Sequence, residues 1–170
     1  MRRNRQELPQ AECIELITRS TSGVLSLVGD GGYPYGVPLS YVYRDGALFF
    51  HSAVEGHKVD AVRADGRCSF TIVAKDEVHP GEYTTYFRSV IVFGRISIIA
   101  DEAEKIAALR LIGERYNPGD DVALNREVGK HLTSAGHLQH MLLLRLDIEH
   151  LSGKEAIELV RAREQKHLTS

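Results

Sequence analysis

The chain has 170 residues, and its composition of 43% hydrophobic and 26% charged residues is that of an ordinary globular domain rather than of a disordered or membrane protein. Its 21 basic and 23 acidic residues give a formal net charge of −2, so the overall charge does not attract nucleic acid or anionic lipid. We expect a single domain over residues 1–170, without a signal peptide or a transmembrane segment, and a cytoplasmic location.

The first predicted element is a short amphipathic helix at about residues 9–20. Pro9 suits its first turn, and Ile14 and Ile17 share one face. Turns that contain glycine then separate three predicted strands, at residues 23–28, 35–43 and 47–53. This first part of the chain therefore indicates antiparallel strands that follow a helix.

Longer elements are predicted in the second part of the chain. In order they are a helix at 56–65, a strand at 67–74, a loop at 75–83, a strand at 84–100, a helix at 101–116, a strand at 140–151 and a C-terminal helix at about 154–165. Gly94, inside the long β-branched strand, predicts a bulge of the kind that curls a barrel. Six strands joined mainly by hairpin turns favour a mainly-β fold: a six-stranded antiparallel Greek-key barrel with peripheral helices.

Signatures of several other site types are missing. The sequence has no G-x-G-x-x-G, no G-x-x-x-x-G-K-[ST] and no G-x-S-x-G motif. Cys13 and Cys68 lie far apart without C-x-x-C spacing, which argues against a disulfide framework or a thiolate zinc site. Histidines in the second half raise the alternative of a metal protein, but their spacing matches no standard zinc site; these are His131, His137, His140 and His150. We therefore expect no metal.

The segment FFHSAVEGHKVD, residues 49–60, carries the most suggestive group of polar residues. It predicts a strand end, a turn and then a helix that begins near Gly56, His57 and Lys58. The N–H groups and the dipole of a helix start attract anions, Lys58 adds a positive charge, and Gly56 allows a ligand to approach the backbone. The segment thus indicates a phosphate site, with a solvated surface turn as the alternative.

His51 and Ser52 stand at the end of the preceding strand. Successive side chains of a strand point to opposite faces, so His51 and Ser52 should diverge, and at most one of them needs to face a ligand directly. The alternative for His51 is a core histidine whose hydrogen bonds are satisfied within the protein.

Three segments, YPYGVPLSYVY, LFFHSAVEGHKVD and YFRSVIVFGRISI, occur in this order. In this respect the chain resembles the pyridoxamine 5'-phosphate oxidase-like FMN-binding split barrel family, nearest its 5-nitroimidazole-resistance (Nim) subgroup. The resemblance implies a split barrel that forms a homodimer, with FMN at the subunit interface. The C-terminal part lacks the tryptophan and the basic ending of the oxidase branch itself, which argues against oxidation of pyridoxamine phosphate.

The resemblance also implies which positions contact the flavin. The residues expected along the ring and its pyrimidine edge are Pro38, Leu39 and Ser40. Those expected at the ring or the ribityl chain are His51 and Ser52. Those expected at the phosphate are His57 and Lys58. A further flavin-contacting stretch on the long strand is Arg88, Ser89 and Val90, for which the alternative is an ordinary barrel strand with one exposed arginine.

These expectations lead to a functional hypothesis. A flavin brings its own redox chemistry, so the protein needs only to hold the ring and stabilise its charge. We expect an FMN-dependent oxidoreductase that passes electrons from NAD(P)H to a small planar acceptor such as a nitroaromatic or a quinone, with His51 as the proton source. The alternatives are a non-enzymatic flavin or haem binding or sensing protein and a plain dimerisation module.

Overall fold

The computed structural model describes residues 4–132, 138 and 140–168. Besides three short 3₁₀ turns, its elements are β1 (Glu7–Leu8), α1 (Gln10–Arg19), β2 (Ser22–Val28), β3 (Pro34–Ser40), β4 (Val42–Arg44), β5 (Ala47–Ser52), α2 (His57–Ala64), β6 (Arg67–His79), β7 (Thr84–Ile98), α3 (Glu102–Tyr116), α4 (Asp121–His131), β8 (Leu142–Glu155) and α5 (Ile157–Leu168). None of the helices within the described ranges is long and apolar enough to cross a membrane.

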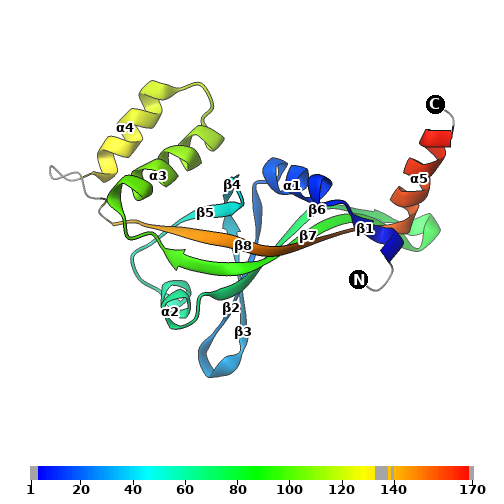
Figure 1. The fold of residues 1–170 in the computed structure, drawn as a ribbon, viewed down its shortest axis with the longest axis horizontal. Helices are drawn as coiled ribbons and strands as arrows, with labels where there is room; N and C mark the ends of the chain where they lie inside the picture. The colour runs from blue at the N-terminus through cyan, green and yellow to red at the C-terminus, as the bar shows by residue number, and fades with distance from the viewer. Residues whose placement is uncertain (1–3, 133–137, 139, 169–170) are drawn as a thin grey trace.

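The strands form one antiparallel sheet that curls on itself. Its strand order is β3-β2-β6-β7-β8-β5-β4, and β1 pairs with β8 in addition. The two end strands of this path, β3 and β4, are separated in the chain by Tyr41 alone, so the sheet must bend until its edges meet at that residue. Helices lie around this sheet (Figure 1), with the α3–α4 pair at one end and α5 at the other. The predicted class, a mainly-β antiparallel split barrel with peripheral helices, is confirmed.

Several boundaries differ from the prediction. The sheet has eight strands rather than six, because β1 was not predicted and the segment 35–43 breaks at Tyr41 into β3 and β4. The predicted loop at 75–83 is mostly strand, since β6 continues to His79 and pairs with β7 as a two-stranded ribbon. A ribbon beyond the barrel has no buried face, and the apolar alternation by which strands are identified is therefore missing there.

The C-terminal boundary and α4 are also corrections. Lys154, predicted to begin the last helix, belongs to β8 and pairs with β1, so α5 begins only at Ile157. α4 was not predicted at all. The Asp120 carboxylate accepts a hydrogen bond from the Ala123 N–H and caps this helix, and Leu124 is buried on its inner side.

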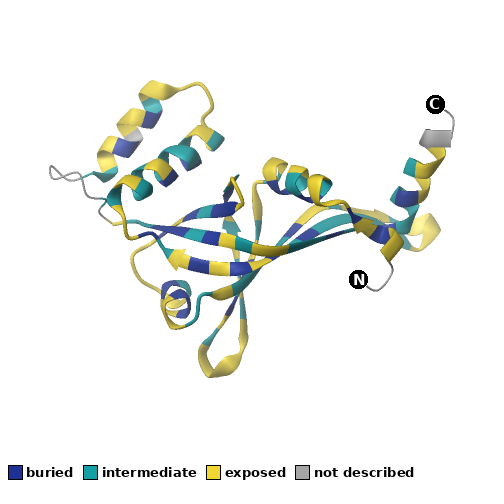
Figure 2. Ribbon diagram, in the orientation of Figure 1, coloured by how far each residue is buried: buried dark blue, intermediate teal, exposed yellow. Residues whose placement is uncertain are grey.

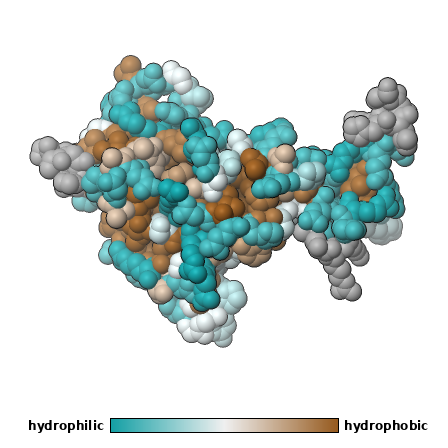
Figure 3. Space-filling model, in the orientation of Figure 1, coloured by the Kyte–Doolittle hydropathy of each residue, from teal (hydrophilic) through white to brown (hydrophobic). Residues whose placement is uncertain are grey.

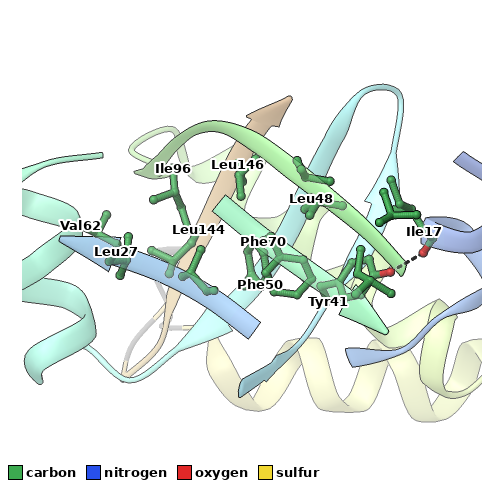
Figure 4. Packing of buried hydrophobic residues seen from close by; sticks show 14 of the residues in the cluster. Ile17, Leu27, Tyr41, Leu48, Phe50, Val62, Phe70, Ile96, Leu144 and Leu146 are labelled. Carbon is green, nitrogen blue, oxygen red and sulfur yellow. Dashed lines mark hydrogen bonds between the residues drawn. The ribbon is translucent and has the colours of Figure 1, made fainter. Parts of the chain in front are cut away.

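The main core fills the inside of the curled sheet. Figure 2 shows buried residues alternating with exposed ones along the strands, as expected of a sheet with one covered face. At the centre, the ring of Phe70 lies edge-on to Tyr41, at 4.9 Å, and to Phe50, at 5.3 Å (Figure 4). The Tyr41 hydroxyl donates a 2.5 Å hydrogen bond to the carbonyl oxygen of Ile17, which ties α1 to this core.

A second, smaller core lies on the outer side of β5 and β8. Here α3 contributes Ala108 and Ile112, which pack toward Val42 and Leu143 from the strands and Ile99 just after β7. The sheet is therefore covered on both sides at this end.

Gly94 lies at the predicted bulge. The register of β7 against β8 shifts between Phe93 and Gly94, so the prediction is confirmed. A Cβ atom on Gly94 would lie 2.0 Å from the carbonyl oxygen of Asp147, far inside contact distance, and that oxygen belongs to the backbone of the neighbouring strand. Only glycine fits here without moving β8.

We expect Gly94→Ala to lower the free energy of unfolding by about 1–3 kcal/mol, the usual cost of forcing an extra methyl group into a packed region. Urea unfolding of the two proteins measures the difference. Gly129→Ala is the matched control, because a Cβ there meets nothing within 4 Å and alanine favours a helix, so its stability should stay equal or rise slightly. Equal stabilities of Gly94→Ala and the parent protein would contradict the tight bulge.

Candidate functional site

One face of the barrel is an open sheet surface, which we call the outer sheet face. It is formed by side chains that point away from the main core on four adjacent strands: Pro38 and Ser40, Val24 and Val28, Thr71 and Val73, and Ser89, Ile91 and Phe93. Several of its apolar members are well exposed, among them Val28 at 47%, Val73 at 62% and Phe93 at 44%. A sheet face with this much exposed apolar surface is typical of an interaction site.

The flavin-contacting residues predicted on β3 divide between two faces. Pro38 and Ser40 are exposed on the outer sheet face, and Leu39 between them is half-buried against the main core. On β7, Ser89 faces outward with its strand partner Val73, whereas Val90 is completely buried. Pro38, Ser40 and Ser89 therefore share one surface, whereas the side chains of Leu39 and Val90 point to the main core.

The start of α2 lies against the turn between β2 and β3. The His57 ring is 4.4 Å from that of Tyr35, and His57 Nδ1 is 3.8 Å from a carboxylate oxygen of Asp30. Gly56 precedes the helix with φ of 121°, in a region that favours glycine, and no side chain caps the first turn. Sequence reasoning missed this contact, because no pattern in the chain indicates that the turn at residue 30 meets a helix start at residue 57.

Lys58 is half-buried in the first turn of α2. Burial lowers the pKa of Lys58, because loss of solvent penalises its ammonium form. Over the described ranges, no carboxylate lies within ion-pair distance of its Nζ atom, although Arg63 at the other end of the same helix pairs with Asp60. A desolvated cation without a partner, at a helix start without a cap, is suited to receiving an anion.

His51 and Ser52 point to opposite sides of β5, as predicted. His51 is exposed beside Phe49 on the side of α3, and Ser52 is buried on the side of the main core. The Ser52 hydroxyl has no hydrogen-bond partner within the described part of the chain. An unsatisfied buried hydroxyl is costly, so a ligand group that reaches Ser52 would bind favourably.

Arg88 is engaged with a buried carboxylate instead of facing outward with Ser89. Its Nε donates a 3.0 Å hydrogen bond to Oε2 of Glu155, a residue with no exposed surface. The other carboxylate oxygen of Glu155 lies 2.8 Å from Nη2 of Arg163 on α5. The strand sequence alone gave no sign of this ion pair, since Glu155 was predicted to lie in a helix.

The expected absence of a metal stays a prediction. Within the described ranges, no group of three or more histidine, cysteine, aspartate or glutamate side chains could hold a metal ion. His137, one of the histidines that raised the alternative, lies outside those ranges.

Comparisons with known proteins give a consistent result. The family described as pyridoxamine 5'-phosphate oxidase matches residues 9–155. Among solved structures, a candidate 5-nitroimidazole antibiotic resistance protein from Bacteroides thetaiotaomicron is 18% identical over 88% of this chain and 86% of its own, with a TM-score of 0.68. An FAD-binding protein from Mesorhizobium loti is 29% identical over 89% of this chain and 97% of its own, with a TM-score of 0.56.

A third solved structure, an FAD and haem binding protein from Mycobacterium smegmatis, is 22% identical over 89% of this chain and 73% of its own, with a TM-score of 0.71. No curated protein matches the chain.

The family match begins at Pro9, before α1, and ends at Glu155, the last residue of β8, so it includes the outer sheet face and the start of α2. It agrees with the resemblance carried by the three sequence segments. The chain therefore belongs to the pyridoxamine 5'-phosphate oxidase family.

Proposed function

We propose that the protein binds FMN, with the phosphate at the start of α2. The observation that carries the proposal is Lys58, a half-buried cation whose pKa is lowered by burial and that has no ion-pair partner in the described ranges. A phosphate dianion would satisfy Lys58 and the first N–H groups of the helix together. His57 would add a donor, and the flexible backbone at Gly56 would let the phosphate approach closely.

Four of the other predicted positions would contact the rest of an FMN molecule. The unsatisfied Ser52 hydroxyl, five residues before His57, would find a partner in the ribityl chain or the ring edge. Pro38, Ser40 and Ser89 would line the ring from the outer sheet face. Two structural relatives, one described as binding FAD and the other as binding FAD and haem, support a flavin as the ligand.

We further propose that the protein is an oxidoreductase. A bound FMN supplies the electron transfer, from NAD(P)H to a small planar acceptor such as a nitroaromatic or a quinone. The chain's own residues hold the ring, keep water from one side of it and provide a proton. His51 is our candidate for the proton source, because its imidazole is exposed and histidine is the side chain that most often transfers protons in enzymes.

A second candidate function is flavin or haem binding without catalysis. It is favoured by the relative from Mycobacterium smegmatis, which is described as binding both FAD and haem. Steady-state consumption of NAD(P)H in the presence of nitroaromatic and quinone acceptors separates the two candidates. Turnover supports the oxidoreductase, and a flavin that stays oxidised under these conditions supports the binding protein.

We also propose a homodimer that forms through the outer sheet face. A flavin ring is too large for the interior of a small barrel that side chains already fill, so part of its site must come from another molecule. A second copy would cover the exposed valines of this face and shield the ring at the same time.

The phosphate site is tested by Lys58→Ala. The change removes a charge-assisted hydrogen bond worth about 1.5–3 kcal/mol, so the affinity for FMN should fall about tenfold to a hundredfold. Purified parent protein should be yellow, and denaturation should release FMN rather than FAD. The affinity for riboflavin, which lacks the phosphate, should stay nearly unchanged when measured by fluorescence quenching.

Arg63→Ala serves as the control, since it removes the same charge from the other end of α2. Loss of affinity for FMN and riboflavin alike, or for neither, would mean that the start of α2 is a solvated turn. Release of FAD would keep the flavin proposal and overturn the choice of FMN.

Binding of FMN should also depend on pH through Lys58. The pKa of Lys58 in the free protein lies below its ordinary 10.5, and a bound phosphate should raise it by stabilising the ammonium form. Binding therefore takes up a proton between these two pKa values, and the affinity for FMN should fall as pH rises through that window. Titrations from neutral pH to about pH 10 measure the effect. Riboflavin carries the same ring, so an equal fall in its affinity would assign the dependence to the ring instead.

The dimer is tested by Val73→Glu, which places a charge in the middle of the outer sheet face. Light scattering at micromolar concentration should show a dimer for the parent protein and a monomer for the variant, because an unpaired charge buried in an interface is costly. Val122→Glu, the same substitution at a position that is 81% exposed on α4, should remain a dimer. A flavin-loaded parent protein that is monomeric would contradict the proposal.

A further inference from the structure

A cavity of about 590 Å³ opens on the opposite side of the sheet from the outer sheet face. It lies between α1, β6, β7 and α5, and its volume falls in the range of small-molecule sites. Its walls combine three apolar side chains, Leu16, Ala74 and Leu159, with three cations, Arg19, Lys75 and Arg88.

Basic and acidic side chains are distributed unequally around this cavity. Arg19 pairs with Glu15 and Lys75 pairs with Glu77, but both carboxylates are more than half exposed and neither lines the cavity. The cations therefore line the cavity, whereas their carboxylate partners lie outside its lining. Three cationic side chains and no carboxylate line the cavity, although the protein as a whole carries a formal charge of −2, and such a lining favours an anionic ligand.

Arg88 is fixed in place beneath this cavity. Its Nε and Nη2 atoms bind Oε2 of Glu155, at 3.0 and 2.9 Å, and Arg163 holds the other oxygen of the same carboxylate. These contacts leave Nη1 of Arg88 without a partner in the described part of the chain, and the side chain is 34% exposed. An arginine held by a buried carboxylate loses little conformational entropy when an anion binds to its remaining donor.

We propose that this cavity binds a small organic anion. Its carboxylate or phosphate group contacts Arg19, Lys75 and Arg88, and its apolar body packs against Leu16, Ala74 and Leu159. The site is separate from the start of α2 and does not depend on flavin binding. The family resemblance implies that both Arg88 and Ser89 contact the flavin. Because they face opposite sides of β7, we assign Arg88 to the organic anion instead.

Calorimetric titration of the full chain with benzoate, phenyl phosphate and benzamide tests the proposal. Benzoate and phenyl phosphate share an apolar ring and differ in the anionic group, so the tighter of the two identifies the preferred anion. Benzamide has nearly the shape of benzoate but no charge, and it should bind at least about tenfold more weakly than the tighter anion. The backbone amides of Ser20 and Ala74 should shift in NMR spectra during the titration, and those of His57 and Lys58 should not.

Two variants locate the site. Arg19→Met and Lys75→Met each keep a long apolar stem and should each weaken binding of the tighter anion about tenfold. Both side chains contact solvent, so folding should survive at least one of the changes. Arg95→Met is the matched control, since Arg95 is an exposed arginine of β7 that pairs with Glu149 outside the cavity, and its affinity should stay within about twofold.

Three results would overturn the proposal. Neither anion binds saturably at millimolar concentration, benzamide binds as tightly as benzoate, or Arg95→Met weakens binding as much as Arg19→Met. The first would mean that the cavity does not take such ligands, the second that it is only an apolar hollow, and the third that net charge alone attracts the anions.

Discussion

The curl of the sheet depends on how Tyr41 is held. This residue separates the two end strands of the sheet, and contacts from three directions fix it. Its N–H donates to the carbonyl oxygen of Thr21, its hydroxyl donates to Ile17, and its own carbonyl oxygen accepts from the hydroxyl of Tyr116. Because the ring is also buried against Phe70, the bend between β3 and β4 is set by hydrogen bonds and packing together. α1, the start of β2 and α3 all meet the barrel at this point.

Closure of the barrel produces two surfaces of different chemistry. The outer sheet face has exposed valines and small hydroxyl side chains, whereas the opposite side is covered by α1 and α5 and carries the cationic cavity. Figure 3 shows hydrophobic residues gathered over the sheet between the α3–α4 pair and α2, bordered by hydrophilic residues. Successive residues of β7 point to opposite sides of the sheet, so Arg88 lines the cationic cavity whereas its neighbour Ser89 lies on the outer sheet face.

Much of this arrangement follows from local rules. Alternation along a strand was enough to predict that His51 and Ser52 diverge, and Gly94 marked a bulge because only glycine tolerates such an approach of two backbones. Contacts between distant segments were not predictable in this way. The contacts of Asp30 with His57 and of Arg88 with Glu155 form only in the closed barrel. The local sequence around each residue does not indicate its partner.

The end strands of the sheet also limit how the protein can associate. An open sheet edge presents unpaired N–H and C=O groups that can recruit a strand from another molecule and start aggregation. Here one edge, β3, contains Pro34 and Pro38, which have no N–H to offer, and the other, β4, is only three residues long. Both edges are therefore poor templates for a foreign strand. Association of copies of the chain through their sheet edges is disfavoured, while the broad face of the sheet, with its apolar side chains, remains free for specific contacts.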